Sequence, residues 1–335
     1  MNLRDRRAIH HTAAQSLANT KGDPRKILLI YLGIITGLSL FVAAASLILS
    51  NRIANTGGLG NMGLRSVLST IKSVLPMAQS LVFLGLEMGY TTMALKIVRG
   101  ESVSNETLFG GFQRFFPYLR AQILLGLLYL GLGLASIYPS AYIFLSLPMA
   151  EGFYEVITPL MESTSVLNGT ITLDEATLAA ATEAMMPALW IYGVAFLLLF
   201  IPTYYRYRMV IYRLIDQPRP GALRAMRESR SLMRRNFFAL FRLDLTLWWF
   251  YVLQALILAL CYCDMLLPML GITLPWSENV SYFVFLSLSL LLQFVVYYFS
   301  MNRVAVTYAT AYTTLHLTEE QPKQPVTPNP WQDQY

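Results

Sequence analysis

Charged side chains are scarce in this chain. Aspartate, glutamate, lysine and arginine together make up 13% of its 335 residues, whereas a soluble domain carries about 25%. The mean hydropathy is +0.48, and several uncharged runs are longer than the roughly 18 apolar residues that indicate a transmembrane helix. This composition argues against a soluble domain and predicts a multi-pass membrane protein.

Cysteine and histidine, which build most metal and redox sites, are also rare. The two cysteines, Cys261 and Cys263, are two residues apart in an apolar helix and face different sides. They therefore match neither a redox pair nor a zinc pair. The three histidines are His10, His11 and His316, and the motifs of metalloproteases, serine hydrolases and P-loop proteins do not occur. We expect no enzyme activity, no metal and no cofactor.

Six apolar runs each supply about the 20 residues that a helix needs to cross a bilayer core of about 30 Å. They are residues 27–50, 74–95, 121–148, 186–205, 245–267 and 280–301. The predicted fold is all-α and integral to a membrane, with six transmembrane helices in a domain over residues 27–318. Residues 1–26 form an amphipathic segment before it, and residues 319–335 form a Pro/Gln-rich tail that we expect to be disordered. The first run is too long for a cleavable signal peptide.

The basic residues between the runs fall almost entirely on one side. Residues 1–26 hold six, 96–120 four, 206–242 ten, and the segment after the sixth run two, which makes 22 of the 25 in the chain. On the opposite side, residues 149–185 hold six acidic residues and no basic one. Because positively charged loops stay in the cytoplasm, both termini are predicted to be cytoplasmic.

A weak internal repeat is visible in two aromatic and basic segments. Residues 115–122 lead into the third run and residues 237–244 into the fifth, each after a polar stretch with helical periodicity. The stretch before the first run is built similarly. The sequence thus predicts three units, each a cytoplasmic interfacial amphipathic helix followed by a transmembrane hairpin.

The most basic of these interfacial helices is predicted over residues 220–236. Asp216 and Pro218 indicate a turn before it. Its apolar side chains lie along one face, namely Leu223, Met226, Met233, Phe237 and Leu240. Its arginines lie on the other, namely Arg224, Arg227, Arg234 and Arg235. This pattern is typical of a helix on the inner leaflet, either as a topology anchor or as a site for lipid headgroups or a protein partner.

Three polar side chains are predicted to share one depth inside the membrane. Glu87 lies eight residues from the inner end of the second run, Gln254 nine from that of the fifth, and Gln293 eight from that of the sixth. No run contains a lysine or arginine to pair with Glu87. The layer is either a hydrogen-bond cluster that holds the helices together or part of a path for an ion, a proton or a substrate.

The stretch from residue 201 to residue 249 resembles a known family. The matching residues are Ile201-Pro202, Tyr207, Asp216-Gln217-Pro218, Ala225, Ser229, Leu232-Met233, Phe241, Leu243-Asp244-Leu245 and Trp248-Trp249, with Leu108-Phe109-Gly110-Gly111-Phe112 before the third run. They are similar to an uncharacterised bacterial multi-pass membrane family, domain of unknown function 975, and distantly to the membrane region fused to some glycerophosphodiesterases. Thr203 and Arg235 stand where that family usually has glycine. The family implies no agreed activity.

The candidate site residues combine this motif with the basic helix. They are Pro202, Asp216, Pro218, Ser229, Met233 and Asp244, with the four arginines, as family-motif and lipid-facing residues. The favoured hypothesis is a non-enzymatic protein of the bacterial cytoplasmic membrane, with an accessory or envelope-homeostasis role through its basic cytoplasmic face. Its expected partners are anionic lipid headgroups at the inner leaflet, with no nucleic acid and a protein partner left open. The alternative is a small transporter or permease that uses the polar layer around Glu87.

Overall fold

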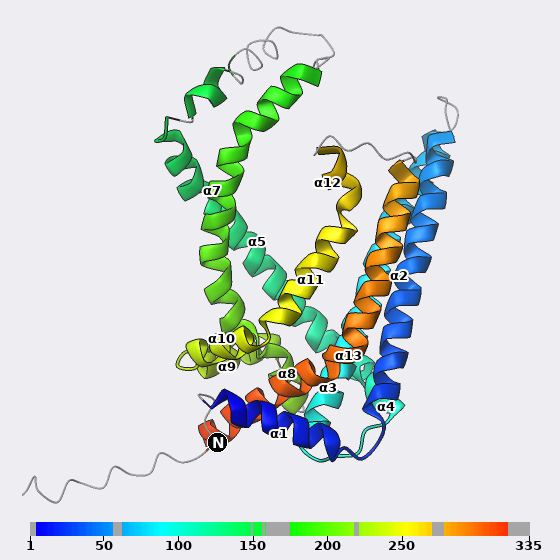
Figure 1. Ribbon diagram of the computed structural model, residues 1–335, viewed down its shortest axis with the longest axis vertical. Coiled ribbons are helices and arrows are strands. Elements are labelled where there is room, and N and C mark those ends of the chain that lie inside the picture. Colours follow the sequence, from blue (N-terminus) through cyan, green and yellow to red (C-terminus); the bar gives the residue numbers. More distant parts are fainter. Residues whose placement is uncertain are drawn as a thin grey trace, which may run out of the picture. The chain divides into compact units, whose positions relative to one another are not determined.

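The computed structural model describes residues 5–55, 62–148, 150–155, 158, 175–217, 221–269 and 278–320. The regular elements in these ranges are all helical. They are α1 (Arg6–Ala18), α2 (Pro24–Asn55), α3 (Met62–Val98), α4 (Asn105–Phe109), the 3₁₀ helix η2 (Gly110–Arg114), α5 (Phe115–Leu145), α7 (Glu175–Tyr207), α8 (Val210–Asp216), α9 (Ala222–Met233), α10 (Phe237–Thr246), α11 (Trp248–Cys261), α12 (Cys263–Met269) and α13 (Glu278–Glu320) (Figure 1). The all-α prediction is confirmed.

Within these ranges, five helices are long and apolar enough to cross a membrane, and the bent pair of α10 and α11 is a sixth candidate. The multi-pass prediction is therefore confirmed. Most of the acidic segment 149–185, Pro218 and the tail residues 321–335 lie outside the described residues. The chain divides into two compact units: unit 1 is Met1–Leu119 with Met209–Tyr335, and unit 2 is Arg120–Arg208.

The fifth predicted span is not one straight helix. The chain bends by 70° between α10 and α11, although it has neither proline nor glycine there. The Thr246 hydroxyl donates to the Leu243 carbonyl at 2.6 Å. The Leu247 amide donates to the backbone carbonyl of Asp244, three residues earlier, rather than to that of Leu243, four residues earlier. A threonine that bonds back onto its own helix in this way competes with the regular backbone ladder. The straight apolar helix α11 therefore begins at Trp248 rather than at residue 245.

Several helices are longer than the predicted apolar runs, and α3 begins at Met62 rather than at residue 74. α7 begins at Glu175, inside the segment expected to be a loop up to residue 185, because an alanine-rich stretch favours helix there. α13 has 43 residues, which corresponds to about 64 Å at about 1.5 Å per residue. It continues without a break from the sixth apolar run to Glu320.

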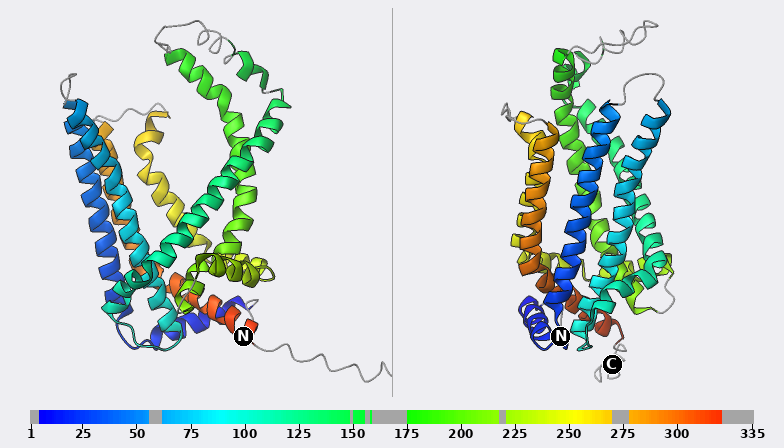
Figure 2. Two further views of the ribbon diagram at one scale, coloured as in Figure 1. Left: turned by 180° about the vertical axis from the view of Figure 1, so that it is seen from behind. Right: turned by 90° about the vertical axis from the view of Figure 1, so that its right-hand side faces the viewer.

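The core of unit 1 is built around α2, α3 and α13, which pack side by side (Figure 2). The Tyr31 ring of α2 stacks on the Tyr90 ring of α3, with 4.8 Å between centroids. The Tyr90 hydroxyl donates to Asn302 Oδ1 of α13 at 2.7 Å, and Asn302 Nδ2 donates to the Pro24 carbonyl at 3.3 Å. Because buried polar groups are costly unless paired, these bonds fix the register of the three helices.

The second half of α13 lies inside unit 1 rather than at its surface. Val306, Ala309 and Tyr312 are each 0% exposed, and α1 packs against this half with Ile9, which is also fully buried. The buried hydroxyls along it, such as that of Thr310, donate to carbonyls four residues earlier. A threonine satisfied in this way can be buried without an external partner. Residues 302–320 are thus part of the folded domain.

Unit 2 contains most of α5 and the whole of α7. Four aromatic residues of α7 lie four residues apart and their rings stack in sequence, namely Tyr192, Phe196, Phe200 and Tyr204. Tyr129 of α5 contacts Phe200, with ring centroids 5.1 Å apart. This spacing places the four rings on one face of α7, where they pack against the facing helix.

His10 ties α1 to the bend before α11. Its Nε2 lies 2.7 Å from the Thr246 hydroxyl, which gives its own proton to Leu243. The Thr246 oxygen must therefore accept, so His10 carries its proton on Nε2. His10 Nδ1 is buried and has no hydrogen-bond partner in the described ranges. Burial and, to a smaller extent, the charge of Arg303 lower the pKa of His10.

We predict that this attachment loses stability on acidification. The lowered pKa means that the unfolded chain binds the proton first, so the contribution of His10 is complete above about pH 6.5 and is lost as the pH falls below that value. The variant His10→Gln keeps a donor for Thr246 and does not titrate. In thermal unfolding from about pH 8 to about pH 5, it should lose less stability than the wild type.

The control for this prediction is His11→Gln, because His11 is exposed on the same helix. It should follow the wild type. Parallel pH dependences of the wild type and His10→Gln would show that His10 does not carry the effect.

Candidate functional site

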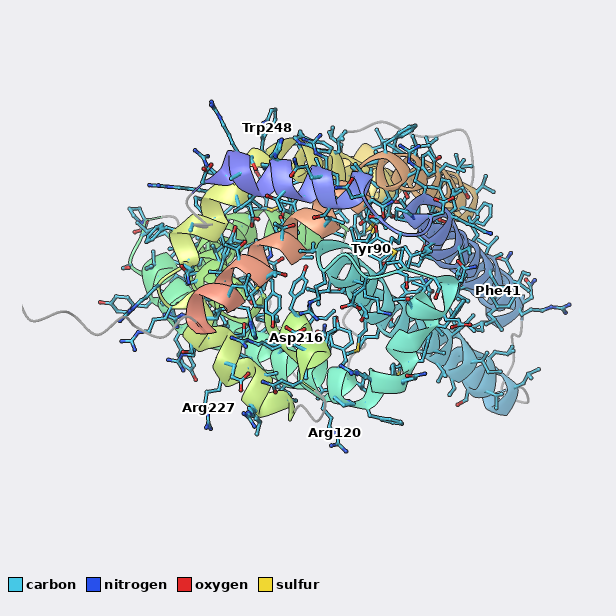
Figure 3. All side chains as sticks on the ribbon, turned by 90° about the horizontal axis from the view of Figure 1, so that it is seen from below. Phe41, Tyr90, Arg120, Asp216, Arg227 and Trp248 are labelled. Carbon is cyan, nitrogen blue, oxygen red and sulfur yellow. The ribbon has the colours of Figure 1, made fainter. Side chains whose placement is uncertain are left out.

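Asp216, at the end of α8, joins three elements of unit 1. Its Oδ1 accepts a hydrogen bond from Arg99 Nη2, just after α3, at 2.5 Å. Its Oδ2 accepts one from the Tyr312 hydroxyl of α13 at 2.6 Å. α8 ends at this residue, as the Asp-Gln-Pro turn predicted. Figure 3 views unit 1 from the end at which both Asp216 and α1 lie. The motif aspartate is thus a structural clamp.

Aromatic and basic groups surround this clamp. The Tyr312 ring stacks on that of Tyr212, with centroids 5.0 Å apart. The guanidinium of Arg213, which is only 7% exposed, lies 5.9 Å from the Tyr312 centroid. A cation over an aromatic face is stabilised by the ring quadrupole. The clamp therefore holds a buried positive charge beside the Asp216 carboxylate.

A second motif aspartate plays a similar role at the 70° bend. Asp244 of α10 is 8% exposed and accepts a hydrogen bond from the Tyr308 hydroxyl of α13 at 2.8 Å. Since Tyr308 uses its proton there, the Tyr251 hydroxyl of α11 donates to Tyr308 across 2.5 Å. Asp244 thus holds both sides of the bend against α13.

The buried face of the basic helix α9 agrees only in part with the apolar face that the sequence predicted. Ser229 and Met233 are 0% and 1% exposed because α9 packs against α8 and α13 within unit 1. Both are therefore protein-facing rather than lipid-facing residues. Leu223, expected on the apolar face with Met233, is instead 67% exposed.

The arginines of α9 and the turn that follows it are exposed, as predicted for the polar face. They are Arg224, Arg227, Arg230, Arg234 and Arg235, and Figure 3 shows Arg227 pointing away from the unit. Arg224 pairs with Glu228 one turn later, at 2.8 Å, and Gln217 Nε2 donates to the same carboxylate. These bonds orient the start of α9 after α8.

The three residues of the predicted intramembrane layer do not bond to one another. Glu87 Oε2 accepts from the Tyr118 hydroxyl of α5 at 2.9 Å. Gln254 Oε1 accepts from the Tyr297 hydroxyl at 3.3 Å, and Gln293 is half-buried on α13. The partners are thus phenols, which sequence spacing did not indicate. A shared depth for the layer remains a prediction.

Sequence reasoning missed a glycine contact at the centre of unit 1. Gly85 and Gly89 of α3 face the α4–η2 segment, where Gly111 lies against them. A Cβ atom on Gly89 would overlap the Leu108 carbonyl, and one on Gly111 would overlap the Gly85 carbonyl and the Gly89 amide. Backbones approach this closely only where side chains are absent. The four-residue spacing of Gly85 and Gly89 on α3 was the sequence feature that could have indicated this close contact.

This contact borders a cavity of about 430 Å³ in unit 1. One wall is formed by the last turns of α3, from Met88 to Lys96, and by Arg99 just after it. The other wall is the segment from Glu101 to Arg114, and Ile215 at the end of α8 also lines the cavity. Arg114 Nη1 donates to the Ile215 carbonyl, next to the Asp216 clamp. The cavity is therefore framed by the glycine contact on one side and by the clamp on the other.

Residues 1–305 match the family described as Protein of unknown function (DUF975). The chain belongs to this family. No curated protein and no solved structure matches the chain. The predicted resemblance is confirmed, and this DUF975 protein is a multi-pass membrane protein by the length and hydropathy of its helices.

Three motif residues of this DUF975 chain make structural contacts in the described ranges. Asp216 and Asp244 hold α8 and α10 against α13, and Gly111 packs on α3. Pro202 lies inside α7. The same ranges contain no group of three or more His, Cys, Asp and Glu side chains that could hold a metal ion.

We predict that the glycine contact tolerates no side chain. Gly89→Ala should lower the free energy of unfolding by about 1–3 kcal/mol, the usual cost of overpacking, because its methyl group meets the Leu108 carbonyl. Thermal unfolding in detergent would measure this. Gly33→Ala is the matched control, since a Cβ there meets no atom within 4 Å, and it should be neutral or stabilising. Equal stabilities of the two variants would rule out the close contact.

Proposed function

We propose that this DUF975 protein is a non-enzymatic protein of the bacterial cytoplasmic membrane whose α9 arginines bind anionic lipid headgroups of the inner leaflet. The single observation that carries the proposal is the row of exposed arginines on a helix whose opposite face is buried in protein. Each basic residue near an anionic leaflet contributes about 1 kcal/mol. The role would be an accessory or envelope-homeostasis one that needs no chemical step.

Exposed apolar side chains beside the arginines support an interfacial position. Phe238 of α10 is 73% exposed, Leu245 is 53% exposed and Trp248 at the start of α11 is 62% exposed. Aromatic rings and arginines together are typical of the headgroup region, where rings lie at the boundary and guanidinium groups reach phosphates. The charge distribution of the sequence supports a cytoplasmic location for α9 and for both termini.

We predict that removing two of these charges weakens lipid retention. Arg224→Gln/Arg227→Gln should reduce the affinity for phosphatidylglycerol by about 10- to 30-fold, since two charges of about 1 kcal/mol each are lost. Native mass spectrometry of the protein with bound lipid would measure the change. The matched control, Arg65→Gln/Lys72→Gln, removes two exposed charges from α3 and should retain the lipid. Equal losses in both variants would refute a specific role for α9.

The orientation is checked in the same protein after Cys261 and Cys263 are replaced by serine. A cysteine at residue 168, in the acidic segment outside the described residues, should react with an impermeant maleimide in intact cells. A cysteine at residue 224 should react only after lysis. The reverse pattern would place α9 outside and overturn the lipid-leaflet assignment.

A second candidate function, a small transporter or permease, is favoured by one observation. Glu87 is a carboxylate in a predicted membrane span, and its hydrogen bond is to the neutral phenol of Tyr118. A carboxyl group at such a position is a functional hypothesis by default. The same bond equally supports a structural role, because Tyr118 anchors the start of α5 to α3.

We predict that Glu87 is structural. Glu87→Gln keeps an acceptor for Tyr118 and should leave stability unchanged, whereas Glu87→Leu should cost about 1 kcal/mol because the hydroxyl loses its acceptor. Tyr118→Phe removes the same bond and should match Glu87→Leu. Thermal unfolding and pH-dependent flux in proteoliposomes would be measured together. A folded Glu87→Gln variant that had lost a flux shown by the wild type would make transport the better function.

A further inference from the structure

The cavity between α3 and the α4–η2 segment is separate from the arginine face of α9. None of the α9 residues lines it. Its volume of about 430 Å³ lies within the range of about 300–1,000 Å³ typical of sites for small molecules. Polar and charged side chains make up much of its lining, which distinguishes it from a packing defect in an apolar core.

Three cations line the cavity, namely Lys96, Arg99 and Arg114. Asp216 holds Arg99 and the Ile215 carbonyl holds Arg114, each through one terminal nitrogen. Because a guanidinium group has five N–H donors, both arginines retain donors for a ligand. Lys96 is half-buried, and its ammonium makes no hydrogen bond or ion pair in the part of the chain that the structure describes.

Two carboxylates line the same cavity, Glu101 and Glu106. Neither forms an ion pair with Lys96 or with another described cation. A site for a simple anion would be weakened by two nearby negative charges, because like charges repel over these distances. A lining that carries both signs instead suits a ligand with an anionic group and a cationic group.

We propose that this cavity binds a phosphate ester that also carries a primary amine. This chemistry is that of phosphoethanolamine, either free or as the headgroup of a lipid. Phosphate oxygens match the planar fork of Arg99 and Arg114 and the point charge of Lys96. The ammonium of the ligand pairs with Glu101 and Glu106, which lie on the same segment as Arg114. The Asp216 clamp and the Gly89–Gly111 contact keep both walls in place before the ligand enters.

The test uses the full-length protein in nanodiscs of phosphatidylglycerol, which carry no amine lipid, with O-phosphoethanolamine and inorganic phosphate as probes. Equilibrium dialysis should show saturable binding of O-phosphoethanolamine. Lys96→Gln should weaken the binding of both probes by about tenfold, because a charge-assisted hydrogen bond is lost. Glu106→Gln should weaken the binding of O-phosphoethanolamine but not that of inorganic phosphate.

Two further variants keep the test independent of folding. Lys72→Gln lies on the same helix outside the cavity lining and should bind like the wild type. Lys96→Arg keeps the charge and should restore much of the binding lost in Lys96→Gln. Thermal unfolding of each variant shows whether it is folded, and neither expectation depends on the α9 arginines.

The outcomes decide between the sources of the ligand. If O-phosphoethanolamine does not bind but phosphatidylethanolamine added to the nanodiscs is retained by the wild type and lost from Lys96→Gln, the occupant is the lipid headgroup. If Glu106→Gln affects both probes alike, the pairing of the ammonium with the two carboxylates is wrong. If no probe or lipid binds, or if Lys96→Gln binds like Lys72→Gln, the proposal is overturned.

Discussion

The close contact between α3 and the α4–η2 segment is the constraint on which the rest of unit 1 depends. Without side chains on Gly85, Gly89 and Gly111, the backbone that leaves α3 turns back and lies directly against it. This reversal sets the wall of the cavity, and it brings the first turn of α5 back so that Tyr118 reaches Glu87. A single methyl group at Gly89 would move all of these groups together, because dispersion and hydrogen bonding both require contact at close range.

The second half of α13 supplies the counterpart to this contact. It carries Tyr308 and Tyr312, whose hydroxyls bond to Asp244 and Asp216, respectively. Each aspartate ends or bends a different segment, so α13 acts as a common support for α8 and α10. Tyr308 and Tyr312 give these two carboxylates neutral phenol donors, and a neutral donor avoids the desolvation cost of a second charge at those bonds. Asp216 also pairs with Arg99, whose side chain is 39% exposed.

Much of this architecture was predictable from the sequence, and what was missed has identifiable physical causes. Hydropathy located the apolar cores of the helices, since about 20 apolar residues are a strong signal. The Asp-Gln-Pro turn correctly marked the end of α8 at Asp216. The bend at Leu247 was not predictable from proline or glycine, because the segment contains neither residue. The part of α13 after the sixth apolar run is polar, yet the hydroxyls of Thr307 and Thr310 are satisfied within α13 and those of Tyr308 and Tyr312 by Asp244 and Asp216. The buried face of α9 includes the predicted Met233 but also Ala225 and Ser229, which are small and weakly apolar and lie against α8.

The positive charge of this end of unit 1 is divided between two environments that act differently. The arginines of α9 are open to solvent, where mobile ions screen them over about 8–10 Å at physiological salt. They suit many weak contacts with a charged surface. Two of the cations beside the α4–η2 segment, Arg99 and Arg114, are held by Asp216 and by a backbone carbonyl, and with Lys96 they share a cavity with two carboxylates. Preorganised charges lose little entropy on binding and discriminate by shape and sign. The basic residues that the sequence predicts on one face therefore belong to two different places. The α9 arginines form a surface suited to attracting anionic groups, and the cations of the cavity form a site suited to discriminating between ligands.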